Sequence, residues 1–244
     1  MDKPKKILIL VEGEKLDVLL MKHLIQIYGL DIDYEIISYR TNVYELYNKM
    51  FRGVNPEDMD ILQVLKEREN NVDKKQIFNQ RFTDILLIFD FEPQDSQFSK
   101  EKISKMVGYF VESTDMGKLY INYPMVEAFY HMNSIPDYAY SERIATLDEL
   151  CDGAYKKRVN KENRNRDYRK FAVNREECNV VISQNIEKAW HILATSSSDI
   201  LAMDSALGKQ LLSKQLEILD EKRQIYVLCT CVFFIAEYNP KLLM

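Results

Sequence analysis

The sequence is poor in glycine and proline, and it holds few cysteines and histidines. Seven glycines and six prolines in 244 residues argue against an all-β protein with many tight turns and favour long helices. The four cysteines form no Cys-x-x-Cys pair and there are only three histidines, so a zinc site is not expected. Reduced thiols and a cytoplasmic location fit this cysteine usage best.

Long apolar runs and an excess of positive charge are also missing. The most apolar stretch, Ile225–Ala236, is well short of the roughly 20 residues that span a bilayer. The short apolar run near the N-terminus ends in acids and reads as a strand rather than a signal peptide, so we expect no membrane association. The net charge of −5 excludes a uniformly basic surface but allows a local basic patch.

The first half of the chain alternates between apolar runs and amphipathic stretches, which is typical of an α/β domain. Unalternated apolar runs suit strands that are buried on both faces of a parallel sheet. The pattern predicts a central, mostly parallel sheet of about four strands flanked by helices. The predicted strands are Lys6–Val11, Tyr34–Tyr39, Asp84–Phe89 and Lys118–Asn122.

Helices are predicted between these strands and throughout the second half of the chain. Apolar residues at i, i+3 and i+4 spacing mark them. We divide the chain into an α/β domain at 1–135, with a helical insertion at about 40–82, and a C-terminal helical region at 136–244. The predicted helices are 16–27 (ending at Gly29), Val43–Phe51, Met59–Glu69, Ser99–Glu112, one opened by Pro124, Arg175–Leu193, Asp199–Arg223 and Ile225–Tyr238.

Acidic residues follow three of the predicted strands. Glu12 comes directly after the first strand, Asp90 and Glu92 follow the third, and Glu127 comes soon after the fourth. Ligands of α/β sheets bind at this carboxyl edge, where converging carboxylates need a cation to neutralise them. Oxygen ligands alone favour Mg²⁺ or Mn²⁺. Each acid alone could instead cap a helix or lie in a solvated turn, and Glu127 fits a first helical turn equally well.

The segments around these acids resemble the two signatures of the Toprim superfamily, which includes primases, topoisomerases and OLD-type nucleases. Residues 11–17, VEGEKLD, resemble the first signature, with its glutamate, its glycine and a helix acid at Asp17. Residues 88–92, IFDFE, resemble the DxD signature that ends a hydrophobic strand. The resemblance covers about residues 5–130 and implies the Toprim fold, with Gly13 at a tight turn.

The resemblance also implies roles for the acids. Glu12 takes the place of the family's general acid/base or metal ligand, and Asp90 and Glu92 take the places of the metal-binding DxD acids. Two features depart from the family: Glu92 replaces the second aspartate, and the two motifs are separated by a longer stretch than in minimal Toprim domains. A catalytic centre of Glu12, Asp90 and Glu92 is therefore expected, with Glu127 as a further metal ligand.

A short stretch between positions 156 and 170 concentrates positive charge. Basic side chains neutralise phosphates, and the interleaved aromatic rings of Tyr155, Tyr168 and Phe171 are suited to stack on unpaired bases. The alternative is an ordinary solvated helix face, since Glu162 and Asp167 dilute the charge. The predicted nucleic-acid-binding residues are Lys156, Lys157, Arg158, Lys161, Arg164, Arg166, Arg169 and Lys170.

Together these features predict a metal-dependent nuclease that hydrolyses phosphodiester bonds of DNA or RNA. Residues 122–127, NYPMVE, resemble a segment of defence-associated Toprim proteins, which implies a bacterial antiphage role. No P-loop motif occurs, so an ATPase or sensor partner is expected, and the C-terminal helices offer a surface for a homo-oligomer. The alternative is a non-catalytic, nucleic-acid-binding or regulatory Toprim-like subunit, which the Glu92 departure permits.

Overall fold

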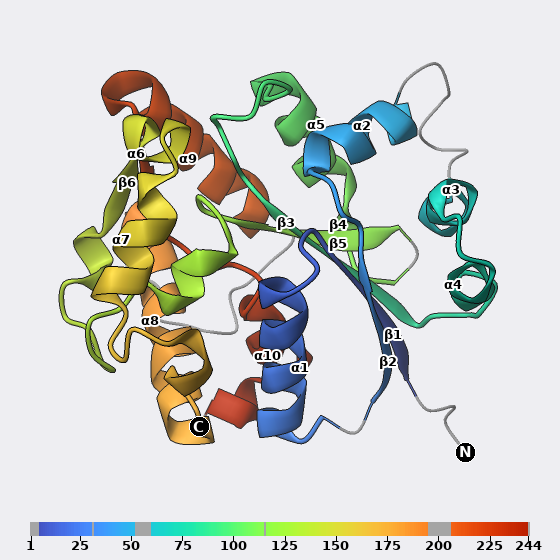
Figure 1. Cartoon of the computed structure of the whole chain (residues 1–244), viewed down its shortest axis with the longest axis horizontal. Helices are drawn as coiled ribbons and strands as arrows, with labels where there is room; N and C mark the ends of the chain where they lie inside the picture. The colour runs from blue at the N-terminus through green and yellow to red at the C-terminus, as the bar shows by residue number, and fades with distance from the viewer. Residues whose placement is uncertain (1–4, 31, 52–59, 115, 195–205, 244) are drawn as a thin grey trace.

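A five-stranded sheet forms the centre of the molecule in the computed structural model, which describes residues 5–30, 32–51, 60–114, 116–194 and 206–243. The strand order is β2-β1-β3-β5-β4 (Figure 1), and only the short edge strand β4 runs antiparallel to its neighbour. The strands are β1 (Lys6–Val11), β2 (Asp33–Ser38), β3 (Asp84–Asp90), β4 (Val111–Glu112) and β5 (Gly117–Asn122).

The predicted α/β class and mostly parallel sheet are confirmed, with four parallel strands and one additional antiparallel strand. The two central strands are buried along nearly their whole length, as expected for a sheet with both faces covered. Parallel pairing sets Val11 opposite Ile88 and Asp90 opposite Asn122. The carboxyl ends of β1, β3 and β5 therefore meet at one edge of the sheet.

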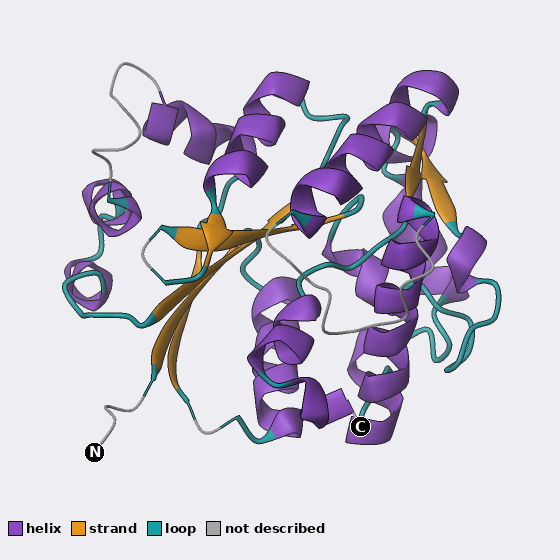
Figure 2. Cartoon of the chain, turned by 180° about the vertical axis from the view of Figure 1, so that it is seen from behind, coloured by secondary structure: helices purple, strands orange, loops and turns teal. Residues whose placement is uncertain are grey.

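Helices cover both faces of this sheet. Two of them lie on one side and two on the other, as opposite views show (Figures 1 and 2). The first pair is α1 (Leu16–Tyr28) and α10 (Phe233–Tyr238), and the second is α2 (Val43–Phe51) and α5 (Lys100–Tyr109). The stretch between β2 and β3 also holds α3 (Ile61–Arg68) and α4 (Val72–Ile77).

Local signals set the ends of these helices. The Ser99 side chain accepts a hydrogen bond from the Lys102 backbone N–H and caps α5, as its residue type predicts. Gly29 ends α1 in the left-handed conformation, with φ 56°, which glycine adopts without steric cost. Met59, the first residue of one predicted helix, lies outside the described residues.

The C-terminal part packs beside the sheet and is mostly helical. Its longest helices contact each other, and one of them contacts α5. The α-helices are α6 (Leu147–Cys151), α7 (Ala154–Glu162), α8 (Arg175–Leu193) and α9 (Leu207–Lys222). Short 3₁₀ helices are η2 (Val126–Tyr130), η3 (Tyr140–Glu142), η4 (Tyr168–Lys170) and η6 (Pro240–Leu243).

Two predictions for this part are corrected. It is not helical throughout, because β6 (Ile144–Thr146) and β7 (Gln224–Tyr226) form a small antiparallel sheet. The predicted helix at 225–238 is wrong in its first half. The range opens with strand β7, and within it the structure has a helix only at α10. The predicted start of the preceding helix, at Asp199, lies outside the described residues.

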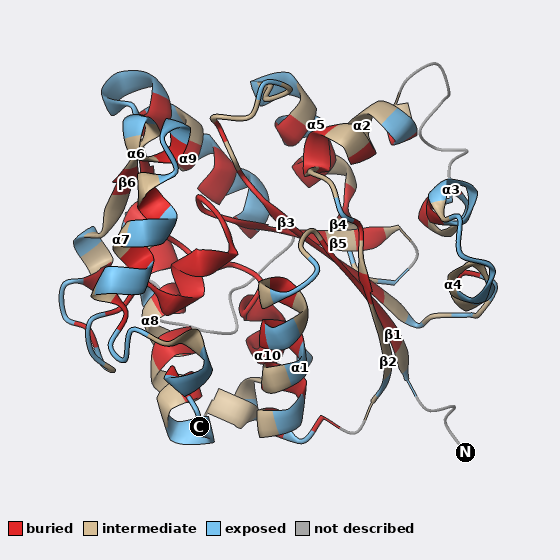
Figure 3. Cartoon of the chain, viewed as in Figure 1, coloured by how far each residue is buried: buried red, intermediate tan, exposed pale blue. Residues whose placement is uncertain are grey.

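The segment after β7 joins the C-terminal part to the main sheet. Leu228 pairs antiparallel with Tyr123, just beyond β5. The Asn185 side-chain oxygen on α8 accepts hydrogen bonds from the Cys229 backbone N–H at 2.8 Å and the Tyr140 hydroxyl at 2.7 Å. Buried apolar residues of both parts form one continuous core (Figure 3).

The cysteines are all free, and three of them are buried. Cys151 is exposed, whereas Cys178, Cys229 and Cys231 lie inside the protein. Within the described ranges, no helix has both the length and the apolar character needed to cross a membrane.

Candidate metal centre

Three predicted acids meet where the course of the chain through the sheet reverses direction. Strand β1 lies between β2 and β3. The chain therefore continues from β1 towards one edge of the sheet to form β2, and later towards the opposite edge to form β3 and β5. Open α/β sheets bind ligands at such a switch point. Glu12 directly follows β1, and its backbone N–H donates to the Ile88 carbonyl at 3.0 Å. Asp90 is the last residue of β3.

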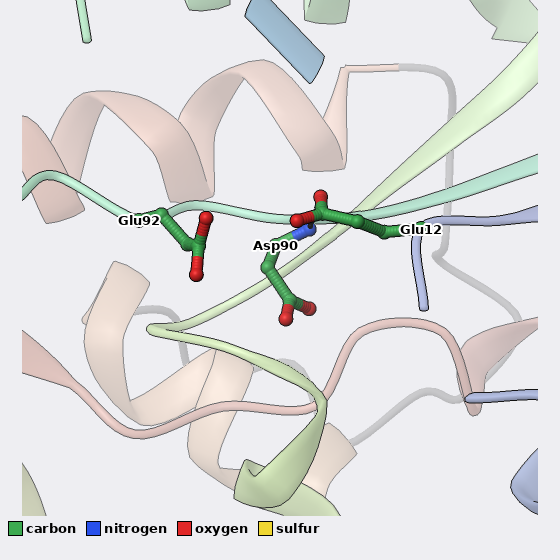
Figure 4. Close-up of side chains that lie close together, drawn as sticks. All are labelled: Glu12, Asp90 and Glu92. Atoms are coloured by element: carbon green, nitrogen blue, oxygen red, sulfur yellow. Dashed lines mark hydrogen bonds between the residues drawn. The ribbon is translucent and has the colours of Figure 1, made fainter. Parts of the chain in front are cut away.

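The carboxylates of Glu12, Asp90 and Glu92 surround one space (Figure 4). One oxygen from each lies within 4.8 Å of the others, close enough for a shared metal ion. Glu12 Oε2 also accepts the Asp90 backbone N–H at 3.1 Å, and Asp90 Oδ1 accepts the Val126 N–H at 2.9 Å. These bonds fix the orientation of two carboxylates.

Glu92 is held in place by its backbone. Its φ of 39° is left-handed, which costs a non-glycine residue about 1–3 kcal/mol and often marks a functional site. Its N–H donates to the Pro124 carbonyl at 3.2 Å, and its own carbonyl accepts the Asp95 N–H at 3.0 Å. This strained turn brings the side chain back towards Asp90.

Burial and mutual repulsion make the charged form of this cluster unfavourable without a counter-ion. Burial raises the pKa of Glu12 to about 9, and repulsion from Glu92 adds to the effect. Burial, followed by repulsion from Glu12, raises the pKa of Asp90 well above its usual range. Burial also raises the pKa of Glu92, against the attraction of Lys156. A bound cation would reverse these shifts.

Two further carboxylates border the cluster. Glu127, a predicted ligand, is outside the group of three, and its Oε1 pairs with Lys156 Nζ at 3.1 Å. Asp17 is 5% exposed, and burial raises its pKa. Asp17 Oδ1 and Glu127 Oε2 are buried without a hydrogen-bond partner among the described residues. Such orphaned acceptors fit a site that receives a cation.

Asp17 is the site residue that sequence reasoning did not select. The first motif contains it, but a first-turn helix acid is ordinary, and nothing in the local pattern indicates that it is buried. The pairing of Lys156 with Glu127 was also missed, because it depends on how α7 packs against η2.

Gly13 leaves room for close packing and does not have a left-handed backbone. A Cβ at this position would lie 2.4 Å from Asp17 Oδ2. Hydrogen bonding with the Gly13 backbone also lowers the pKa of Asp17, although burial dominates. The Glu-Gly motif therefore allows the Asp17 carboxylate to fold back onto the chain beside Glu12.

The predicted basic residues fall into two groups. Four of them form ion pairs: Lys156 with Glu127, Arg158 with Glu149, Arg164 with Glu177, and Arg169 with Asp167. The other four are exposed and pair with no acid in the described parts of the chain: Lys157, Lys161, Arg166 and Lys170.

The interleaved aromatic residues differ in exposure. Tyr155 is fully buried and Phe171 is 2% exposed, so both belong to the core. Tyr168 alone is partly exposed. Of the three rings, it is therefore the one placed to meet a ligand.

Comparison with known proteins identifies no relative. No protein family, curated protein or solved structure matches this chain. The carboxylate geometry and the local sequence motifs therefore carry the functional argument.

Proposed function

We propose that this protein is a Toprim-like, metal-dependent nuclease that hydrolyses phosphodiester bonds in DNA or RNA. The observation that carries the proposal is the meeting of Glu12, Asp90 and Glu92 within 4.8 Å at the switch point of the sheet. The two motifs and the order of these acids support the Toprim assignment. The exposed basic residues between positions 157 and 170 suit a phosphate backbone.

The donor set fits a hard divalent cation such as Mg²⁺ or Mn²⁺, because every donor is a carboxylate oxygen. Glu12, Asp90 and Glu92 would hold it, with Glu127 available at the border. A bound cation would polarise the phosphate and lower the pKa of a coordinated water. The Val126 N–H fixes the Asp90 carboxylate, so Asp90 would hold the cation in a defined position. Glu12 uses only one oxygen for the Asp90 N–H, so its other oxygen is available either to hold the metal or to accept a proton.

The test is cleavage of labelled single- and double-stranded DNA and RNA with Mg²⁺, with Mn²⁺ and with chelator. We expect cleavage only with metal, and a loss of at least about 100-fold in Glu12→Gln and Asp90→Asn. Both changes preserve side-chain size and an acceptor oxygen, so the fold should survive. Glu101→Gln, an exposed acid on α5, is the matched control.

Titration calorimetry with Mn²⁺, combined with the cleavage assay, separates the two functional interpretations. Metal and nucleic-acid binding without cleavage of any substrate would favour the non-catalytic, regulatory alternative. Wild-type cleavage rates in both acid variants, or no metal binding at millimolar ion, would disprove the proposed centre.

An antiphage role, with a separate ATPase or sensor, is the biological setting we propose. It rests on the resemblance of residues 122–127 to defence-associated Toprim proteins. Co-purification from the native host, followed by identification of the associated chains, tests it. Phage protection by this chain alone, with no associated protein, would contradict the partner requirement.

A further inference from the structure

A pocket of about 210 Å³ lies between α1 and the segment that contains η4. Leu16 and Leu19 of α1 line one side, and Tyr130, Tyr168 and Phe171 line the other. A cavity of about 150 Å³ already holds a benzene ring, so this one has room for a larger planar ring system.

The aromatic side of the pocket is a preformed stack. Tyr168 lies on Tyr130 with ring centroids 4.6 Å apart and an angle of 23° between the planes. Phe171 then packs edge-on against Tyr130 at 5.7 Å. Tyr130 and Phe171 are buried, whereas Tyr168 is partly exposed. A further planar ring can therefore continue the stack at Tyr168.

The opposite side of the pocket is apolar and open. Leu19 is 57% exposed, one of the few large apolar side chains exposed in the described chain. His23 adds a polar group to this side, with its Nε2–H donating to the Ala172 carbonyl at 2.8 Å. Pockets of this kind, mostly apolar with few polar groups, bind flat heterocycles.

The segment that lines the pocket carries basic side chains. Arg169 lines the pocket, and its side chain is 85% exposed. Its partner Asp167 offsets part of this charge, but Arg166 and Lys170 are exposed close by in the chain. The pocket therefore combines stacking surface with cations, the combination that binds unpaired nucleotides.

The pocket is linked by chain segments to Asp17 and Glu127, the two carboxylates that border the metal cluster. Leu16 precedes Asp17 on the same chain segment, and Tyr130 belongs to the same 3₁₀ helix as Glu127. After burial, the charge of Glu127 is the next cause that raises the pKa of Tyr168. A molecule that occupies both places would have a ring in the pocket and a phosphate near the acids.

We propose that this pocket binds one unpaired nucleobase of a single-stranded nucleic acid, positioned beside the phosphodiester at the metal centre. The inference rests on the proposed function for the identity of the ligand, but it concerns binding and not cleavage. Stacking accepts any base, because every base has a π face. The substrate is therefore single-stranded, or carries a flipped or unpaired nucleotide, and is read with little sequence preference.

The test measures oligonucleotide binding in the presence of a metal chelator, so that metal-dependent cleavage cannot occur. Fluorescence anisotropy compares a labelled single-stranded oligonucleotide with an abasic one of the same length and charge. Wild type should bind the oligonucleotide with bases more tightly. Tyr168→Ala should weaken that binding about 5- to 150-fold and leave abasic binding unchanged, whereas Tyr168→Phe should behave as wild type.

A second variant acts from the opposite side of the pocket. Leu19→Glu, at an exposed position that tolerates polarity, should also abolish the preference for bases. Tyr138→Ala is the matched control, since Tyr138 is 91% exposed and does not line the pocket. It should leave binding unchanged.

The outcomes separate this inference from the proposed nuclease. Equal binding of both oligonucleotides by wild type, or an equal loss for both in Tyr168→Ala, would overturn the base pocket even if metal-dependent cleavage is found. Base-dependent binding through Tyr168 without any cleavage would support the pocket and contradict the nuclease.

Discussion

At the residue scale, the protonation state of a single buried carboxylate affects the stability of the fold. Without metal, the pKa of Glu12 is raised from 4.5 to about 9 by burial and by repulsion from Glu92. Above the unfolded pKa, the unfolded state releases this proton while the folded state retains it, which favours unfolding. Stability is therefore fully present below the unfolded pKa and is lost as the pH rises towards the folded value.

We expect the metal-free protein to melt at a lower temperature at pH 8 than at pH 5.5. Glu12→Gln carries no charge at either pH, so the difference should shrink by about 2 °C or more. Calorimetry in chelator at both pH values measures it, with Glu101→Gln as the control. An unchanged difference in Glu12→Gln would show that Glu12 is already ionised at pH 5.5.

Local residue chemistry explains which parts of the site could be predicted. Glu12, Asp90 and Glu92 were predictable because parallel strands bring their carboxyl ends to one edge, whatever the distance along the chain. The burial of Asp17 and its contact with Gly13 were not predictable, because they depend on how the chain turns between β1 and α1. The pocket at Tyr168 depends on the packing of η4 against α1, for which the sequence carries no short-range signal.

At the scale of elements, caps and periodicity fix most of the helices. Helix α8 matches the predicted range 175–193, and its cap is a strong local signal. The Asn174 side chain accepts a hydrogen bond from the Glu177 backbone N–H at 2.9 Å. This bond satisfies one of the N–H groups that every helix start leaves free.

Asn174→Ala should lower the free energy of unfolding by about 1 kcal/mol, within a range of roughly 0.5–2 kcal/mol. Asn174→Asp should keep the stability of wild type, because aspartate also caps and its charge suits a helix N-terminus. Urea denaturation followed by circular dichroism measures both. Equal stability of the alanine and aspartate variants would mean that tertiary packing, and not this cap, fixes the start of α8.

The elements that could not be predicted share a physical cause. The stretch Ile225–Ala236 is almost wholly apolar and nearly all of it is buried, so its periodicity does not separate strand from helix. β4 and β6 have two and three residues, too few for an alternating pattern. Strands β6 and β7 are fixed by pairing with each other across a long stretch of chain, whereas β4 is a very short strand that pairs with the adjacent β5.

At the scale of the whole molecule, a few buried polar residues hold the C-terminal part together and connect it to the sheet. Asn185 is fully buried and accepts hydrogen bonds from Cys229 and Tyr140. Asn122, at the end of β5 and also fully buried, accepts the Cys231 backbone N–H at 3.2 Å. Lys188 donates to the carbonyls of Tyr140 and Arg143 at 2.7 and 2.6 Å. Losing one of these acceptors would leave buried donors without partners.

Asn185→Leu should therefore lower the free energy of unfolding by about 2–6 kcal/mol, since it orphans two buried donors at about 1–3 kcal/mol each. Because one core spans both parts, Trp190 fluorescence on α8 and far-ultraviolet circular dichroism should shift together in urea. Asn160→Leu, at an exposed helical position, is the control. A shift confined to the fluorescence signal would mean that the two parts unfold separately.

The free thiols provide a chemical measure of that opening. Cys229 and Cys231 Sγ lie 3.4 Å apart and are fully buried, at the join between the two parts, whereas Cys151 is exposed. A thiol-alkylating reagent reaches Cys151 in the native protein but reaches the inner pair only when the segment after β7 detaches. The labelling rate of Cys229 and Cys231 relative to that of Cys151 thus reports the free energy of this detachment under native conditions.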